Sequence, residues 1–235
     1  LWEEALNRID GKVFRTGNHV KILGGSYNEK YNNCLVTSVE LVKEAKLGLD
    51  KDERDKLFNG IVEYANEIED EELKKYVTEL LFEHEEQFKI APAARLMHHN
   101  YLGGLVEHTF ECLEIAKCLI NNLYKKVDKS SVYAACILHD FGKIFEYKID
   151  TESGLIEYDE KFPKEWLTHS QWGFSNCMAH GFKTVAKMIA AHHGRAEWGA
   201  IVDLNEKDLD PLMYLVHHID DLSAKFGRTA ISDLG

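Results

Sequence analysis

The sequence has few prolines and no apolar run long enough to cross a membrane as a helix. Only 3 of its 235 residues are proline, so little in it interrupts a helix. It opens LWEEALNRID, without the basic start, apolar core or cleavage site of a signal peptide. We therefore expect a cytoplasmic protein with no membrane partner. Because the first residue is Leu rather than Met, we also expect a fragment or a processed chain.

Paired cysteines and an excess of positive charge are missing too. The five cysteines are scattered and form no CxxC pair, which predicts reduced, buried thiols. Lys and Arg total 28 against 40 Asp and Glu, so the formal net charge is −12. This balance excludes a generally basic nucleic-acid binder. The acids are concentrated in residues 50–86, where we expect the solvated faces of helices, so net charge says little about a site.

Hydrophobic residues make up 45% of the chain, enough for one large domain or one domain with an appendage. Before Val42, short apolar stretches alternate with clusters of Gly, Asn and Ser. The stretches GKVF, NHVKILGG and NCLVTSVELV predict three strands, with a hairpin turn at Gly24 and Gly25. We therefore predict a short β-rich segment at residues 1–47, which is too little sheet to stand alone.

From Asp50 onward the apolar residues recur at helical spacing, which predicts a mostly α fold with a helical domain at residues 48–235. The polar residues 148–163 predict a small hairpin or flap within it. Helices are predicted over residues 57–68, 73–81, 105–123, 131–139, 183–193 and 208–226.

Histidine is unusually clustered, because ten of the twelve histidines lie between His98 and His218. A single histidine on an apolar helix face is more often a hydrogen-bonded core residue than a metal ligand. Several of these histidines, however, stand beside acidic residues. That explanation is therefore weaker for the group than for any one member.

The adjacent pair His139 and Asp140 is the strongest candidate for a metal site. In CILHDFGKI an apolar helical run ends in an imidazole and a carboxylate. A buried, unpaired carboxylate is costly, and a divalent cation removes that cost. His108 in GLVEHTF offers a second imidazole and Asp220 in HHIDDL a distal carboxylate, so these four residues predict a one-metal site.

The sequence also offers ligands for a second metal that Asp140 would bridge to the first. His169 in LTHSQW and the pair His192 and His193 in AAHHGRAEWG could complete it. Two metals a few ångströms apart polarise a phosphoryl oxygen, generate hydroxide and stabilise the leaving oxygen. The histidine and aspartate pattern therefore points to phosphoryl chemistry.

The ordered set of these residues resembles the HD-domain phosphohydrolase superfamily, an all-helical, metal-dependent fold. The chain is similar in particular to the 3′–5′ exoribonucleases of the YhaM type, in which an oligonucleotide-binding fold precedes the HD domain. The segments that carry this resemblance are HHNYLGGLVEHT, ILHDFGKIFEY, AHHGRAEWG and LVHHIDDLSAK.

The resemblance implies one or two divalent ions, Mn²⁺ first, with Fe²⁺, Co²⁺ or Ni²⁺ as the other ions that imidazole and carboxylate ligands suit. From the resemblance we also expect a homo-oligomer. His193 matches a family position, where it could be a ligand, a proton donor or a substrate contact. The implied metal ligands are His108, His139, Asp140 and Asp220, with His169 and His192 on the second ion.

The sequence departs from the family pattern at several places. Thr168 stands where the family usually has Gly, so His180 remains a rival to His169 as ligand. Ser223 replaces a common acid, and Asp221 adjoins Asp220 as an alternative carboxylate. The N-terminal segment resembles only part of an oligonucleotide-binding barrel, which needs five strands.

Other residues are candidates for substrate contact. Lys143 could hold a phosphate oxygen as a point charge, which with Asp140 and His193 makes the candidate catalytic set. His98 and His99 could contact phosphate or ribose, or support His108. The remaining candidates are Arg195 and Trp198, a guanidinium and an indole suited to a phosphate and a base.

These observations predict a metal-dependent phosphodiesterase, most simply a 3′–5′ exonuclease that acts on single-stranded RNA or DNA through metal-activated water. A nucleotidase or cyclic-nucleotide phosphodiesterase for small nucleotides is the second hypothesis. A non-catalytic regulatory HD module is the third. The sequence alone leaves the choice of sugar, the metal and its number open.

Overall fold

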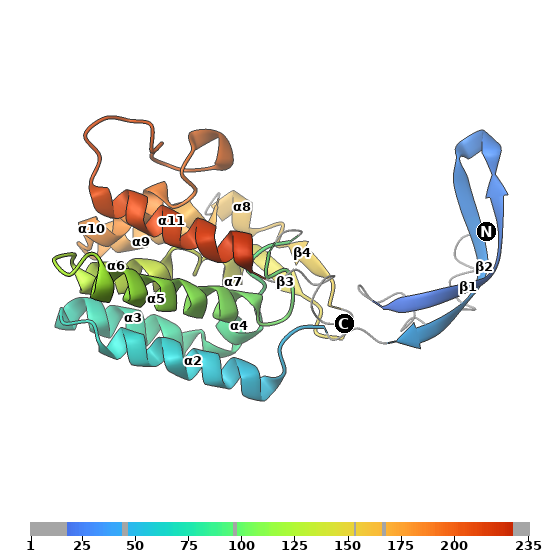
Figure 1. Cartoon of the computed structure of the whole chain (residues 1–235), viewed down its shortest axis with the longest axis horizontal. Helices are drawn as coiled ribbons and strands as arrows, with labels where there is room; N and C mark the ends of the chain where they lie inside the picture. Colours follow the sequence, from blue (N-terminus) through green and yellow to red (C-terminus); the bar gives the residue numbers. More distant parts are fainter. Residues whose placement is uncertain (1–17, 44–46, 96–97, 153, 166–167, 228–235) are drawn as a thin grey trace.

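The computed structural model describes residues 18–43, 47–95, 98–152, 154–165 and 168–227. These residues form a layered helical body and a β-hairpin that extends away from it (Figure 1). The chain is mostly α, as the sequence predicts. Helices α2 (Lys51–Asn66), α3 (Glu71–Glu83) and α4 (Glu85–Ile90) make the first layer.

The other helices carry the candidate site residues. The remaining helical elements are α5 (Gly104–Asn122), α6 (Lys129–Leu138), α7 (Lys143–Glu146), α8 (Phe162–Glu165), α9 (His169–Ala179), α10 (Lys183–Ala191), η3 (Ala196–Trp198) and α11 (Pro211–Phe226).

Local capping explains where several helices begin. Asp50 and Glu53 form a reciprocal capping box at α2, in which each side chain accepts the other's backbone N–H. Thr168 caps α9 by accepting from the backbone N–H of Gln171. The departure at position 168 therefore has a structural role, because it fixes the turn at which His169 enters its helix.

Helix α6 forms the centre of the core. Its residues from Ser131 to Leu138 are all buried, and it packs against α5 and α10. Truncating a side chain such as Leu138 to Ala would cost about 2–5 kcal/mol of stability. A rigid, fully packed helix therefore holds the His139–Asp140 pair at its C-terminal end.

The N-terminal strands differ from the sequence prediction in one respect. Strands β1 (His19–Asn28) and β2 (Asn33–Lys43) pair antiparallel, as expected, but the turn at Gly24 and Gly25 is wrong. Both glycines lie inside β1 at a register irregularity, where a Cβ on Gly25 would come within 2.7 Å of a backbone oxygen. The chain reverses through η2 (Glu29–Tyr31) instead, and Asn32 takes the left-handed conformation. The predicted GKVF strand lies outside the described residues.

A second hairpin confirms the interruption predicted over residues 148–163. Strands β3 (Tyr147–Ile149) and β4 (Ile156–Tyr158) pair antiparallel directly after α7. Gly142, just before α7, lets this segment approach α9, because a Cβ there would lie 2.9 Å from the Cα of His169.

The cysteine prediction is confirmed only in part. All five cysteines are free, and Cys112, Cys136 and Cys177 are buried. Cys34 and Cys118 are exposed, because they lie on the hairpin and on the outer face of α5. Across the part of the chain that the structure describes, no helix is long and apolar enough to span a membrane.

Candidate metal centre

Five helix-borne segments meet at one point in the helical body. His139 and Asp140 follow α6, His192 and His193 follow α10, and His169 begins α9. His108 lies in the second turn of α5, and Asp220 lies on α11. The structure thus brings together all six residues that the resemblance implies as metal ligands.

Two of the imidazoles are aimed by the same device. His139 and His192 each follow the last residue of a helix, where backbone carbonyls lack helical partners. His139 Nδ1 donates to the carbonyl of Cys136 at 2.9 Å, and His192 Nδ1 donates to that of Ile189 at 2.7 Å. With the proton on Nδ1, each neutral ring presents the lone pair of Nε2 to the cluster.

The Asp140 carboxylate, which is 2% exposed, lies between two groups of imidazoles. Its Oδ2 is 3.5 Å from the Nε2 atoms of both His108 and His139. Its Oδ1 is 3.4 Å from His169 Nε2 and 3.7 Å from His192 Nε2. The two oxygens of one carboxylate thus face different sets of nitrogens.

These separations fit ligands around a shared cation. Two atoms that are each about 2.1 Å from one ion lie about 3.0–3.4 Å apart at octahedral or tetrahedral angles. His108 Nε2 lies 3.2 Å from Asp220 Oδ1 and 3.2 Å from His139 Nε2. Asp140 Oδ1 and His192 Nε2 are buried without a hydrogen-bond partner. Buried polar atoms without partners are costly, and a divalent ion would satisfy them.

Burial and charge set the protonation states of the cluster. Burial lowers the pKa of His139 to about 4 and that of His193 to about 2, and it also lowers the pKa of His169. Burial is the largest single influence on the pKa of Asp140 and raises it, but Lys143 and the surrounding imidazoles together outweigh burial and hold this pKa well below its usual range. Neutral imidazoles and an ionised carboxylate are the forms that bind metals.

Two acceptors of the site were missed from the sequence. Glu146 Oε2 accepts from His169 Nδ1 at 2.5 Å, and Ser223 Oγ lies 2.8 Å from His108 Nδ1. Glu146 stands 23 positions from its partner and Ser223 stands 115 from its own. The short spacing from Asp140 to Glu146 along the chain was a usable signal for the first, whereas Ser223 stood out in the sequence only as a departure from the family pattern, with no partner indicated.

A cavity of about 170 Å³ opens beside the cluster. Lys143 lies in its wall and holds Asp140 Oδ2 at 2.5 Å. Trp198, which is 63% exposed, lies at the same cavity. The lining comprises His98, Asp140, Lys143, His192, His193, Trp198, His217, Asp220, Asp221 and Ala224.

Three candidates from the sequence lie elsewhere. His99 is fully buried and lies behind His108, which favours support over substrate contact. Arg195 is exposed and is not among the residues that line the cavity. His180 is exposed at the end of α9, with its ring against Tyr76 and Phe182. It is absent from the described histidine clusters that could hold a metal, so the geometry favours His169.

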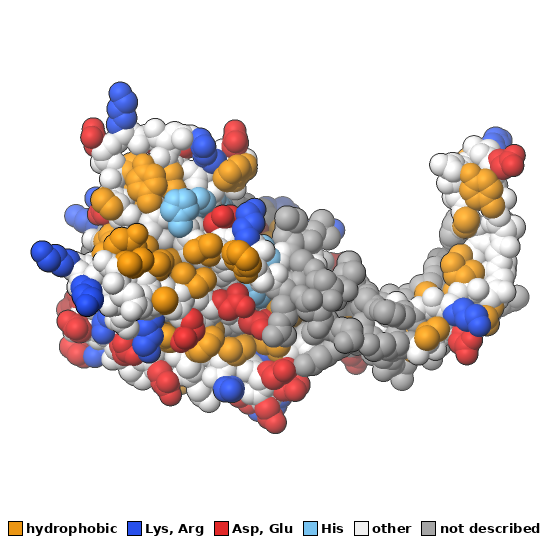
Figure 2. Space-filling model, in the orientation of Figure 1, with side chains coloured by type: hydrophobic (Ala, Val, Ile, Leu, Met, Phe, Trp, Pro, Cys, Tyr) orange, Lys and Arg blue, Asp and Glu red, His pale blue; other side chains and the backbone are white. Residues whose placement is uncertain are grey.

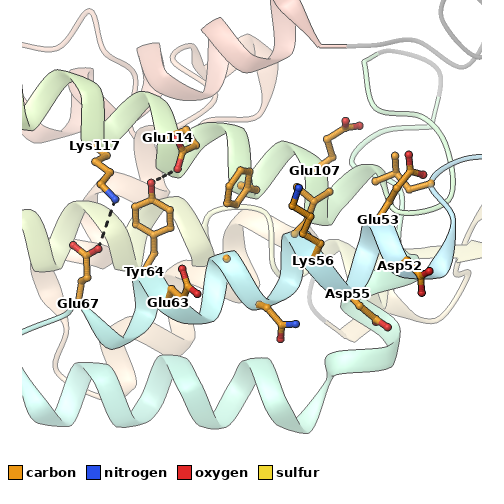
Figure 3. Close-up of a pocket in the computed structure, with 15 residues that line it drawn as sticks. Asp52, Glu53, Asp55, Lys56, Glu63, Tyr64, Glu67, Glu107, Glu114 and Lys117 are labelled. Carbon is orange, nitrogen blue, oxygen red and sulfur yellow. Dashed lines mark hydrogen bonds and ion pairs between the residues drawn. The ribbon is translucent and has the colours of Figure 1, made fainter.

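A larger hollow lies elsewhere on the described surface. It measures about 900 Å³, lies between α2 and α5, and has no histidine in its wall (Figure 3). Lys117 lies there 4.8 Å from the centre of the Tyr64 ring and 3.8 Å from Glu67. Figure 2 shows acidic side chains gathered over the lower part of the helical body, on the side of this hollow. Its lining acids are Asp52, Glu53, Asp55, Glu63, Glu67, Glu107 and Glu114.

The helical layers and the His/Asp cluster at their centre define a class of metal-binding helical domain. The HD-domain family model matches residues 105–225, so the chain belongs to the HD-domain family. A curated relative, "3'-5' exoribonuclease YhaM" from Geobacillus sp. (strain WCH70), is 29% identical over 96% of this chain and 71% of its own length. No solved structure matches significantly. The family and this relative make the chain a hydrolase.

Proposed function

We propose that this protein is a metal-dependent 3′–5′ exonuclease that acts on single-stranded RNA. The observation that carries the proposal is the Asp140 carboxylate, whose two oxygens face separate imidazole sets beside Lys143. The similarity to an exoribonuclease supports the polymer substrate and the direction of attack.

The ligand assignment follows the two faces of Asp140. His108, His139 and Asp220 would hold the first ion together with Asp140 Oδ2. His169 and His192 would hold the second with Asp140 Oδ1. Imidazole and carboxylate ligands without thiolate suit Mn²⁺, Fe²⁺, Co²⁺ or Ni²⁺, and the family resemblance points to Mn²⁺ first. When bound, such an ion lowers the pKa of a water molecule and polarises a phosphoryl oxygen.

The protein's own groups would position the scissile phosphate. Lys143 is 8% exposed and lies in the cavity wall, so its ammonium can face a non-bridging phosphate oxygen without competition from bulk water. His98 and His193 line the same cavity and offer ring nitrogens to the phosphate or the ribose. The His193 ring also lies 3.3 Å, Nε2 to Nε2, from His169.

The size of the cavity favours the end of a polymer over an enclosed nucleotide. Its volume of about 170 Å³ is below the range of about 300–1,000 Å³ for small-molecule pockets. A phosphate fits inside while the rest of the strand stays outside, where the exposed indole of Trp198 can stack on a base. The acidic hollow between α2 and α5 repels a polyanion, so we expect the strand to leave by another path.

The test is Mn²⁺-dependent digestion of oligonucleotides labelled at the 5′ end, as RNA and as DNA. We expect a ladder that shortens from the 3′ end of RNA and vanishes in Asp140→Ala. Lys56→Ala, on the far hollow, is the control variant and should cleave normally. Intact oligonucleotides with hydrolysis of mononucleotides or cyclic nucleotides would instead support the small-nucleotide hypothesis.

A further inference from the structure

We propose that Ser223 and Glu111 are positioning residues that aim His108 at the metal through a relayed hydrogen bond. The proposal rests on the proposed metal-ligand role of His108. It extends that role to two side chains that do not themselves bind the ion. Glu111 lies on α5 and Ser223 lies on α11, so the relay also connects two helices of the site.

The relay runs through three side chains at hydrogen-bond distances. His108 Nδ1 lies 2.8 Å from Ser223 Oγ, and Ser223 Oγ donates to Glu111 Oε2 at 2.7 Å. His108 and Ser223 are 0% and 2% exposed, so water does not replace either contact. His99 Nε2 lies 3.2 Å from the same Glu111 oxygen.

The direction of the protons follows from the chemistry of the three groups. An ionised carboxylate can only accept, so the single hydroxyl proton of Ser223 is used on Glu111. Toward His108, Ser223 is then left with lone pairs alone and must accept. His108 Nδ1 therefore carries the ring proton, and Nε2 keeps its lone pair on the side of Asp220 and Asp140.

The position of His108 in its helix explains why a relay is needed. His139 and His192 use carbonyls at helix C-termini, but His108 lies in the second turn of α5, where carbonyls serve the helix itself. His169, at a helix N-terminus, has no free carbonyl either and uses the Glu146 carboxylate directly. For His108 the carboxylate of Glu111 acts indirectly, through the hydroxyl of Ser223.

The first measurement is calorimetric titration of Mn²⁺ into EDTA-stripped protein. Ser223→Ala removes the acceptor, and we expect metal affinity to fall by about 10- to 100-fold, as for other supporting partners of metal ligands. Glu111→Gln frees the Ser223 hydroxyl to donate in either direction, and its metal affinity should fall by less. Glu114→Gln, one turn further along α5 and hydrogen-bonded to Tyr64 instead, is the matched control and should bind as the parent does.

The second measurement is the ¹⁵N chemical shifts of the His108 ring in the metal-free protein, which report the tautomer. We expect a single Nδ1–H tautomer in the parent and a mixture in Ser223→Ala and Glu111→Gln. The double variant Ser223→Asp, Glu111→Gln places a carboxylate directly beside His108. It should restore both the tautomer and the affinity, which a role in packing alone would not predict.

The outcomes separate the relay from the site it serves. If His108→Ala keeps full Mn²⁺ affinity, the proposed ligand set is wrong. If His108→Ala loses affinity while Ser223→Ala and Glu111→Gln bind Mn²⁺ and keep the tautomer like the parent, the site stands and the relay is overturned. Circular dichroism melting confirms that each variant is folded before it is scored.

Discussion

The two sides of Asp140 are built differently, although each presents a pair of imidazoles. On the first side, His108 and His139 are joined by a second carboxylate, Asp220, whose Oδ1 is 3.2 Å from His108 Nε2. On the second side, His169 and His192 are joined by His193, another neutral imidazole. The first side thus offers a divalent ion the charge of Asp220 as well as its share of Asp140, whereas the second offers only its share of Asp140.

For the proposed ligand set, this difference predicts a strong site next to a weaker one. The free-energy cost of desolvating a divalent ion is offset most fully where carboxylates neutralise its charge. Burial opposes ionisation of Asp220, but the neighbouring imidazoles of His108 and His139 lower its pKa, so this carboxylate stays charged at neutral pH. We therefore expect one ion to be held tightly by the first side and a second to exchange readily.

Removing Asp140 should break both sides at once and gives the largest expected effect. Asp140→Ala should abolish binding of both ions and lower the cleavage rate by about 10³-fold or more, because bound metal ions lower the activation barrier by several kcal/mol. Metal content after gel filtration and single-turnover cleavage check this. Because Asp140 holds the buried Lys143, Asp140→Asn is measured alongside as a near-isosteric variant. Undiminished cleavage in both variants would exclude the proposed centre.

Removing Asp220 should abolish the advantage of the first side alone. Asp220→Asn keeps the shape of the side chain but takes away one negative charge beside His108. We expect loss of the tight Mn²⁺ equivalent while a weak one remains, and a loss of activity smaller than in Asp140→Ala. Asp221→Asn, the neighbouring carboxylate, is the matched control. If Asp221→Asn loses the tight ion and Asp220→Asn does not, the assignment of these two acids is reversed.

Removing His192 should affect only the second side. His192→Ala deletes an Nε2 that has no hydrogen-bond partner, so the metal-free fold should lose little beyond packing and the bond from Nδ1 to the Ile189 carbonyl. The tight ion should still bind, the weak one should bind less, and excess Mn²⁺ should recover part of the cleavage rate. Calorimetry with two resolved steps measures this, and disappearance of the tight step instead would contradict the comparison.

Changing Glu146 should sharpen the comparison with the smallest effect. Glu146→Gln weakens the support of His169 Nδ1 without removing the ligand. We expect the weaker Mn²⁺ step alone to lose about 10- to 100-fold in affinity, with normal cleavage at saturating metal. Glu152→Gln, exposed in the β3–β4 hairpin, is the control. Equal losses in both steps would show that Glu146 acts on the whole site.

Much of the helical body follows from local rules that a sequence displays. The spacing of apolar residues predicted α2, α3, α5, α6, α10 and α11, because an amphipathic face must repeat with the helix. The β-hairpin was harder, since Gly24 and Gly25 suit both a turn and a bulge between close strands. Only the pairing partner distinguishes the two, and that partner lies in β2. The boundary between the β-rich segment and the helical domain at residue 47 stays a prediction.

The sequence by itself determined which residue types could form the site. Histidines and aspartates beside apolar helical runs, in an ordered set, point to a metal centre whatever the details of packing. That information is local because a helix end and its flanking residues are read from one stretch of chain. It placed His139 and Asp140 together, since they are adjacent, and it named His108, His169, His192 and Asp220 without a distance between any of them.

Only the tertiary structure decided how those residues act. It favoured His169 over the exposed His180, moved His99 behind the site, left Arg195 outside the cavity, and gave the two oxygens of Asp140 different neighbours. It also brought Ser223 to His108 across 115 positions of sequence and to Glu111 across 112. Hydrogen bonds and metal ligation require atoms within about 3 Å, and helices distant in sequence reach that proximity only when the core has packed.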